Sequence, residues 1–385
     1  MSVAETLPPE LRNTRAPSKR PRLDFVDALR GWAILAVLSV HTTMFISGPL
    51  PSWLRHVADQ GARGVQLFYV ISAFTLFLSL ARRQDQEENP ERNFFIRRFF
   101  RIAPMFYIAL AIFLFRDGFG PRYWLGDAPR LTGWNILANI LFVNGLNPYT
   151  LNSIISIGWS VAIEMMFYLL LPFLFSRVRD LRTALWLTLI ALLGSVALDQ
   201  TLIRLHPIGS DELWRNYLFM WLPSQAPVFC LGIVFYFYWE KMDSETGARM
   251  SLWFVCAASV LCAFACFGGY SLLPGHFVFG IAFVLLALGL AAKPIFAFVN
   301  PTTCAIGKVS YSLYLTHLLV LPLCARIMNK VYNATGLYWP GLAEYFFLWM
   351  LAVAACFVVA GACYLTIEKP GIELGHRVIR RLEAR

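Results

Sequence analysis

Long runs of apolar residues recur along the whole chain, and each is about as long as a lipid bilayer is thick. The runs hold 17–24 residues, which is the length that a membrane-spanning helix needs. Apolar and polar positions do not alternate with a period of two, so the runs do not predict the strands of a barrel. We expect an all-α, polytopic membrane protein with about ten transmembrane helices. The predicted spans are 26–47, 64–81, 99–116, 157–175, 183–200, 217–239, 251–270, 275–292, 308–327 and 344–367.

A further segment, 134–146, is short, and Asn135, Asn139 and Asn144 interrupt it. The distribution of Lys and Arg decides whether it crosses, because cytoplasmic loops carry an excess of both. If 134–146 does not cross, the cytoplasmic segments hold 23 basic residues and the outer loops 9; if it crosses, the counts become 15 and 17. We therefore predict a short outer-face or re-entrant helix near 134–146, with both termini in the cytoplasm.

Composition narrows the class of protein. The 385 residues are 58% hydrophobic and 15% charged, with a mean hydropathy of +0.58, which excludes a soluble protein of this size. The net charge of +10 follows from basic residues spread over six short inner segments, so a nucleic acid is not an expected partner. We predict a basic cytoplasmic tail at 1–22, a membrane domain at 23–370 and a second basic cytoplasmic tail at 371–385.

Two ionisable residues share a stripe of the first span. Arg30 and His41 are eleven residues apart, which is about three helical turns or 16 Å. A charged side chain near the bilayer centre costs about 2.5–3.5 kcal/mol, so such residues indicate a functional site. Asp27, one turn before Arg30, is a candidate ion-pair partner. Snorkelling of Arg30 and a buried structural role for His41 are the alternatives.

Two arginines begin the third span. Arg98 and Arg101 are one turn apart, and guanidinium groups at that spacing can clamp phosphates. The alternative is a positive-inside anchor between interfacial aromatic residues.

A lone carboxylate lies in the fourth span. Glu164 follows Trp159 and Ser160, and by the predicted boundaries its depth matches that of His41. A histidine and a glutamate at one depth could act as a base and its orienting partner. The alternative is a purely structural pair.

The ninth span carries a polar stripe. Ser310, Tyr311 and Tyr314 lie within two turns of His317, and either a site or a polar helix-packing face explains them. The eight cysteines form no C-x-x-C pair and accompany no cluster of acids or histidines, so we expect them to pack in the core and expect no metal site.

These stretches, in this order, resemble the bacterial acyltransferase 3 family of integral-membrane acyltransferases. The resemblance covers roughly residues 20–370. The family's motifs are matched by Arg30 and His41, by Arg98, Arg101, Pro104 and Tyr107, by Trp159, Ser160 and Glu164, and by Ser310, Tyr311, Tyr314 and His317. The second-span pattern departs from the family at Gln66, where an acid is usual, and at Ala73, where a glycine is usual.

The resemblance implies O-acylation, usually O-acetylation, of a cell-envelope glycan or a lipid-linked sugar. Acetyl-CoA or another acyl-CoA would be the cytoplasmic co-substrate, with no bound cofactor. Arg98 and Arg101, with Arg30, would meet the CoA phosphates, while His41 would act as general base or acyl carrier and Glu164 would orient it. Asp27, Trp159, Ser160, Ser310, Tyr311 and His317 would bind substrate or support the site. A cell inner membrane is the expected location.

A transporter of a lipid-linked sugar or small anion is the competing hypothesis. Many transporters carry internal repeats, and the sequence shows none.

Overall fold

The computed structural model describes residues 23–205, 207–268, 272–336 and 341–384. Within this part of the chain, all regular structure is helical, and ten helical segments are long and apolar enough to cross a membrane. The predicted polytopic, all-α fold is confirmed. The predicted tail at 1–22 lies outside the described residues.

Each of these ten segments contains one long helix. The long helices are α1 (Asp24–Thr42), α3 (Gly64–Arg83), α4 (Pro90–Asp117), α6 (Trp159–Arg177), α7 (Leu181–Leu205), α9 (Leu222–Lys241), α10 (Ser244–Phe267), α11 (Gly275–Ala292), α13 (Ser310–Thr335) and α14 (Gly341–Cys363). Shorter helices connect or extend them: α2 (Ser52–Asp59), α5 (Gly133–Ile140), α8 (Asp211–Met220), α12 (Pro301–Lys308) and α15 (Lys369–Glu383). Helix α1 ends at Thr42, before the predicted boundary at 47, and α13 runs past the predicted boundary at 327.

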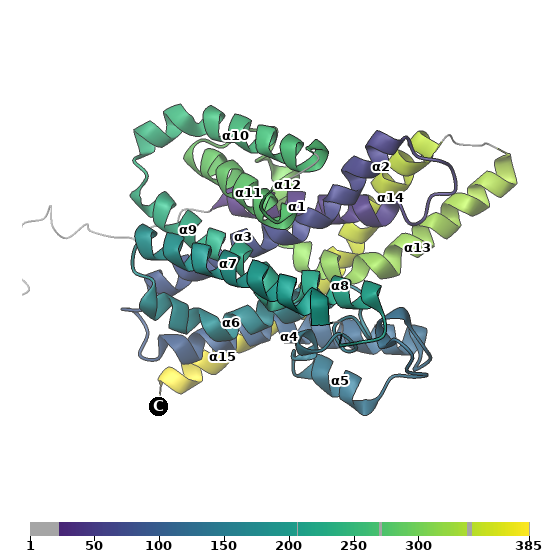
Figure 1. Cartoon of the computed structure of the whole chain (residues 1–385), viewed down its shortest axis with the longest axis horizontal. Helices are drawn as coiled ribbons and strands as arrows, with labels where there is room; N and C mark the ends of the chain where they lie inside the picture. Colours follow the sequence, from purple (N-terminus) through teal and green to yellow (C-terminus); the bar gives the residue numbers. More distant parts are fainter. Residues whose placement is uncertain (1–22, 206, 269–271, 337–340, 385) are drawn as a thin grey trace, which may run out of the picture.

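Helices α1 and α3 form the centre of the bundle. Helix α1 packs against α3, α11, α12, α13 and α14, and α3 also packs against α9. Most of the span that contains α3 is buried, whereas only 17% of α10 is. Figure 1 shows α10 at one edge of the bundle, next to α11. The polar side chains of Gln66 and Ser72 in α3 are buried and therefore face protein and not lipid.

Glycines bring α1 into close contact with α12. A Cβ atom on Gly307 would overlap the backbone oxygen of Asp27, and one on Gly31 would overlap that of Thr303. Small residues allow such close approach of helices in membranes, where packing and not the hydrophobic effect drives association. Because α13 follows α12 after one residue, this crossing fixes α13 against the helix that carries Arg30.

The segment 134–146 contains a short helix, as predicted. Helix α5 has eight residues and begins with a capping box between Thr132 and Asn135. The side-chain amides of Asn135 and Asn144 donate to the backbone oxygens of Tyr149 and Leu151. The asparagines therefore hold a folded connection and do not lie in a span, although the side of the membrane on which α5 lies stays a prediction.

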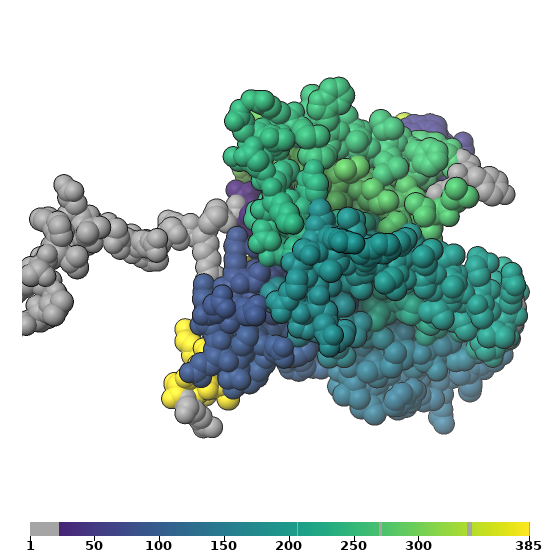
Figure 2. Space-filling model, turned by 60° about the vertical axis from the view of Figure 1, so that its left-hand side comes forward, coloured from purple at the N-terminus to yellow at the C-terminus, as the bar shows by residue number. Residues whose placement is uncertain are grey.

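The second predicted tail, 371–385, is helical up to Glu383. Helix α15 packs along α4, with Gly371 and Gly375 against Phe100. Figure 2 shows the yellow C-terminal segment beside the blue region of α3 and α4. Asn93 donates to Glu383 at 2.7 Å and joins the two helices.

A polar cluster links the α3–α4 connection to this junction. Glu87 accepts hydrogen bonds from Arg83 (2.8 Å), Arg97 (2.8 Å) and Asn93 (3.1 Å). Burial by itself raises the pKa of Glu87, but these hydrogen bonds outweigh it and hold the pKa below its ordinary value. The cluster fixes the first turns of α4, the helix that carries Arg98 and Arg101.

Candidate active site

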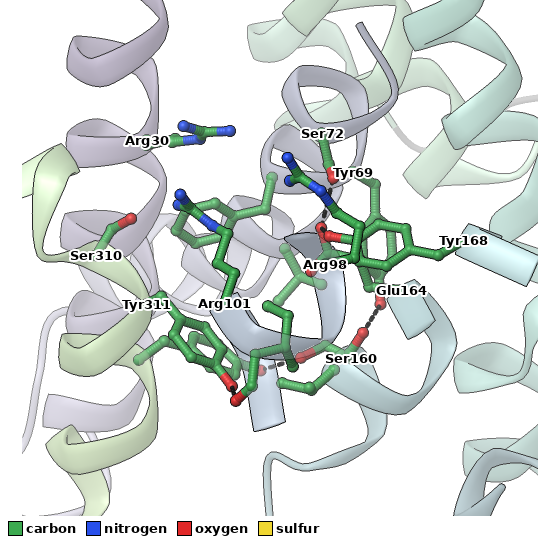
Figure 3. Close-up of a pocket in the computed structure, with 15 residues that line it drawn as sticks. Arg30, Tyr69, Ser72, Arg98, Arg101, Ser160, Glu164, Tyr168, Ser310 and Tyr311 are labelled. Atoms are coloured by element: carbon green, nitrogen blue, oxygen red, sulfur yellow. Dashed lines mark hydrogen bonds between the residues drawn. The ribbon is translucent and has the colours of Figure 1, made fainter. Parts of the chain in front are cut away.

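A cavity of about 70 Å³ lies among five helices. Figure 3 shows the residues that line it, which come from α1, α3, α4, α6 and α13. The lining is Arg30, Val65, Phe68, Tyr69, Ser72, Arg98, Arg101, Ile102, Ser160, Val161, Glu164, Tyr168, Ser310, Tyr311 and Tyr314. Seven residues predicted from the sequence thus meet at one place, although they come from four helices far apart along the chain.

Three arginines face this cavity. Arg30, Arg98 and Arg101 direct their guanidinium groups to the same part of it (Figure 3). Arg30 donates to Thr75 at 3.4 Å, and the buried Nε of Arg98 has no hydrogen-bond partner among the described residues. No ion pair joins Arg30 to Asp27 within the described part of the chain, so the partner expected from the sequence is not the one observed.

Glu164 is held by hydroxyl groups and not by a histidine. Its Oε1 accepts hydrogen bonds from Ser72 at 2.5 Å and from Tyr168 at 2.6 Å. The expected contact with His41 is absent from the structure. Helix α1 ends one residue after His41, whereas Glu164 lies five residues inside α6, so the two side chains differ in depth by about 6 Å if depth is counted from the helix ends.

Serine and tyrosine hydroxyls close one side of the cavity. Ser160 donates to the hydroxyl of Tyr314 at 2.7 Å, and Tyr314 donates to the backbone oxygen of Ile157 at 3.2 Å. Tyr69 donates to the backbone oxygen of Ser160. Trp159, which we expected to support the site, is buried beside Tyr69 outside the lining. These bonds orient the tyrosine rings and join α3, α6 and α13 along this wall.

Sequence reasoning missed one buried acid. Glu368 is 1% exposed, accepts a hydrogen bond from Ser312 at 2.9 Å, and interacts electrostatically with Arg101 and Arg30. It ends a π-helical turn, Tyr364–Glu368, and such turns are frequent at functional sites. A lone carboxylate at the end of the last apolar run is the signal that could have found it.

The two predicted histidines form a second polar centre. The imidazole rings of His41 and His317 lie 5.0 Å apart between centroids, and the ring of Tyr314 lies 5.7 Å from that of His317. Neither histidine lines the cavity, but Tyr314 does. Helix α13 therefore connects the two centres, with Ser310, Tyr311 and Tyr314 at the arginines and His317 at His41.

The charges of the cavity decide what it can hold. Three guanidinium groups and one carboxylate line it, so it carries an excess of positive charge in a site of low dielectric. Arginine forks in such a site bind phosphate oxygens through charge-assisted hydrogen bonds. No group of three or more His, Cys, Asp or Glu residues that could hold a metal ion occurs in the described ranges.

The fold and the site define a helical membrane bundle with a cationic cavity and a neighbouring pair of imidazoles. The family model described as an acyltransferase domain matches residues 23–362, and the chain belongs to this family, acyltransferase 3. The protein is a transferase that acts with acyl groups.

Several similar proteins are named as acyltransferases or O-acetyltransferases. The chain is 25% identical to acyltransferase MdmB of Streptomyces mycarofaciens, over 93% of this chain and 94% of that protein. It is 25% identical to the exopolysaccharide production protein ExoZ of Rhizobium meliloti, over 82% of this chain and 90% of that protein. It is 28% identical to the peptidoglycan O-acetyltransferase OatA of Listeria monocytogenes, over 38% of this chain and 23% of that protein. No solved structure matches the chain.

Proposed function

We propose that this membrane O-acyltransferase moves an acyl group, most simply acetyl, from cytoplasmic acyl-CoA to a hydroxyl of a cell-envelope glycan or lipid-linked sugar. The observation that carries the proposal is the cavity in which Arg30, Arg98 and Arg101 outnumber Glu164. A donor that brings phosphate groups offsets this charge. The names of two relatives, an exopolysaccharide production protein and a peptidoglycan O-acetyltransferase, support a glycan acceptor. A transporter accounts for neither the family nor these names.

The distance between the two polar centres suits such a donor. Arg30 and His41 are about 16 Å apart along α1, and the pantetheine arm of acyl-CoA separates its phosphates from the thioester by a comparable length. With the phosphates at the arginines, the arm passes Tyr314 and brings the thioester toward His41. His41 does not line the cavity, so the arm has to extend beyond this space of about 70 Å³ to reach the imidazole.

His41 then acts as general base on the acceptor hydroxyl. The hydroxyl oxygen attacks the thioester carbonyl carbon, the new C–O bond forms, and the C–S bond breaks. The proton passes from the hydroxyl to the imidazole and then to the departing thiolate. If His41 instead carries the acyl group, rapid quenching with labelled donor alone will trap an acyl-imidazole.

Glu164 has a different role from the one expected from the sequence. Its two hydroxyl donors, Ser72 and Tyr168, and its position among the arginines make it a counter-charge for the cationic lining. It limits repulsion among the guanidinium groups in the absence of donor and so keeps them in place to bind phosphate.

The direct test uses purified protein in lipid nanodiscs with radiolabelled acetyl-CoA and an envelope glycan. We expect label in the glycan with wild-type protein and none with His41→Ala at equal protein content. Transfer by His41→Ala at the wild-type rate would remove His41 from the mechanism. Mass and NMR spectra of the envelope glycan with and without the gene identify the acceptor, and unchanged spectra would contradict a glycan acceptor.

We also propose that the protein spans the cell inner membrane with both termini in the cytoplasm, because this topology places 23 basic residues inside and 9 outside. Reporter domains fused to the C-terminus and at residue 130 should report opposite sides. The same side for both would contradict the topology.

A further inference from the structure

Two imidazole rings from different helices meet at the end of α1. The rings of His41 and His317 have centroids 5.0 Å apart and planes inclined by 41°. His317 is fully buried. Within the described part of the chain, Nδ1 of His41 and Nε2 of His317 are both buried and both lack a hydrogen-bond partner. Buried polar atoms without partners are rare in folded proteins and call for an explanation.

The tautomer of His317 follows from its other nitrogen. Nδ1 lies 2.7 Å from the backbone oxygen of Tyr314, and a carbonyl oxygen can only accept, so Nδ1 carries a hydrogen. In the neutral ring, Nε2 is then an unprotonated acceptor. The charged ring would bury an N–H group without an acceptor, which is costly. His317 therefore offers a lone pair at Nε2 and has no donor for it.

The distance between the rings suits a hydrogen bond between the two unpartnered nitrogens. An N–H···N bond of about 2.9 Å, with each nitrogen about 1 Å from its ring centroid, places the centroids about 5 Å apart. The observed centroids are at that distance. A change in the orientation of the His41 ring aligns its Nδ1–H with Nε2 of His317 and gives both atoms a partner.

We propose that Nδ1–H of His41 donates to Nε2 of His317, so that His317 is the positioning residue for the catalytic imidazole. The inference rests on the proposed function and deepens it. The bond fixes the His41 tautomer whose Nε2 lone pair faces the acceptor hydroxyl. When Nε2 takes the hydroxyl proton, the imidazolium of His41 keeps an acceptor at Nδ1. His317 thus takes the orienting role that the sequence suggested for Glu164.

A pair of variants at position 317 tests the hydrogen bond by activity. His317→Gln keeps an acceptor oxygen, whereas His317→Met has a similar volume and a much weaker acceptor. We expect His317→Met to lower kcat by roughly 10- to 100-fold, with unchanged KM for donor and acceptor, and His317→Gln to recover most of the loss. Equal kcat in the two variants, or wild-type kcat in His317→Met, would overturn the proposal.

A double-mutant cycle tests whether His317 acts through His41. In a His41→Ala background, where the catalytic rate is lost and only a trace rate remains, His317→Met should not lower that trace rate further, because the residue that it positions is gone. A further loss of tenfold or more would show an independent role and overturn the proposal. His276→Gln is the matched control, since His276 is also buried and also bonds a backbone oxygen, that of Ser224, away from this pair.

NMR spectroscopy tests the hydrogen bond between the two histidines independently of acyl transfer. Solid-state ¹⁵N NMR of histidine-labelled protein in lipid should show His317 as the Nδ1–H tautomer, and His317→Met should shift the Nδ1 resonance of His41, whereas His276→Gln should not. An Nε2–H tautomer at His317, or an unshifted His41 resonance, would overturn the pair. If wild-type protein transfers no acyl group, the proposed function fails and this spectrum alone decides the inference.

Discussion

Replacing Arg98 by alanine should weaken donor binding and leave the fold intact. Arg98 lines the cavity, and its buried Nε has no partner among the described residues. The variant therefore removes a positive charge from a lining that holds three arginines and one carboxylate, and it breaks no ion pair that the structure describes. We expect little change in thermal stability, because removal of an unpaired buried charge also relieves its desolvation cost.

The expected rise in the KM for the donor follows from the hydrogen bond that Arg98 would make to a donor phosphate. A hydrogen bond between charged groups contributes about 1.5–3 kcal/mol, which corresponds to a rise of roughly 10- to 150-fold in the KM for acyl-CoA. Dephospho-CoA or a truncated pantetheine thioester, which lack one or all of the phosphates, should show a smaller difference between wild type and variant. The acceptor KM should not change.

Arg97 provides the matched control because it is the neighbouring arginine on the same helix. Arg97 is nearly buried and bonds Glu87 at 2.8 Å, outside the cavity. Arg97→Ala should lower stability by about 1–3 kcal/mol without changing the donor KM. The assay is initial-rate kinetics in nanodiscs, with thermal unfolding measured on the same preparations. A normal donor KM in Arg98→Ala, or an equal rise in Arg97→Ala, would refute the assignment of the cavity to the donor.

Three further predictions address the catalytic base, the fold and the polar cluster. His41→Ala should abolish glycan acylation while the protein accumulates in the membrane, as measured by immunoblot and glycan analysis. Gly307→Val should prevent stable folding, seen as loss of a monodisperse peak in detergent, because its side chain would overlap the backbone of Asp27. The folded-state pKa of Glu87 is lowered from 4.5, so its stabilising contribution is complete above that value and is lost as pH falls through the folded pKa. Glu87→Gln should therefore lower the unfolding temperature at pH 7 and make it less sensitive to acid than in wild type.

The number of spans and the charged members of the cavity were predictable as candidates from the sequence, because both depend on local pattern. Apolar length identifies the spans. A charged residue within a span has to face protein, which is why Arg30, Arg98 and Arg101 could be grouped from the sequence, whereas Glu164 was expected beside His41 and lies among the arginines instead. The distribution of Lys and Arg placed Asn135 in a short helix and not in a span.

The partners within the site could not be predicted, because they depend on where helices end and how they are rotated. The apolar run of the first span continues past Thr42, but the helix does not, so His41 lies at the helix end and not at the depth of Glu164. Tyr168 could have been found, since it lies one turn after Glu164. Glu368 stands out in the sequence only as a lone carboxylate at the end of the last apolar run, and the packing of that span against α4 and α13 is what brings it near Arg101.

The separation of the arginines from the imidazole pair suits the proposed acyl transfer. A guanidinium 5 Å from His41 would oppose formation of the imidazolium by about 3 kcal/mol at an effective dielectric constant of 20, whereas one 16 Å away opposes it by about 1 kcal/mol. Arg30 is at the larger distance along α1. Phosphates bound at the arginines reduce even this cost, because they offset the positive charge of the cavity. An anionic donor and a neutral acceptor hydroxyl therefore suit this arrangement, whereas an anionic acceptor group at His41 would leave the charge at the arginines uncompensated.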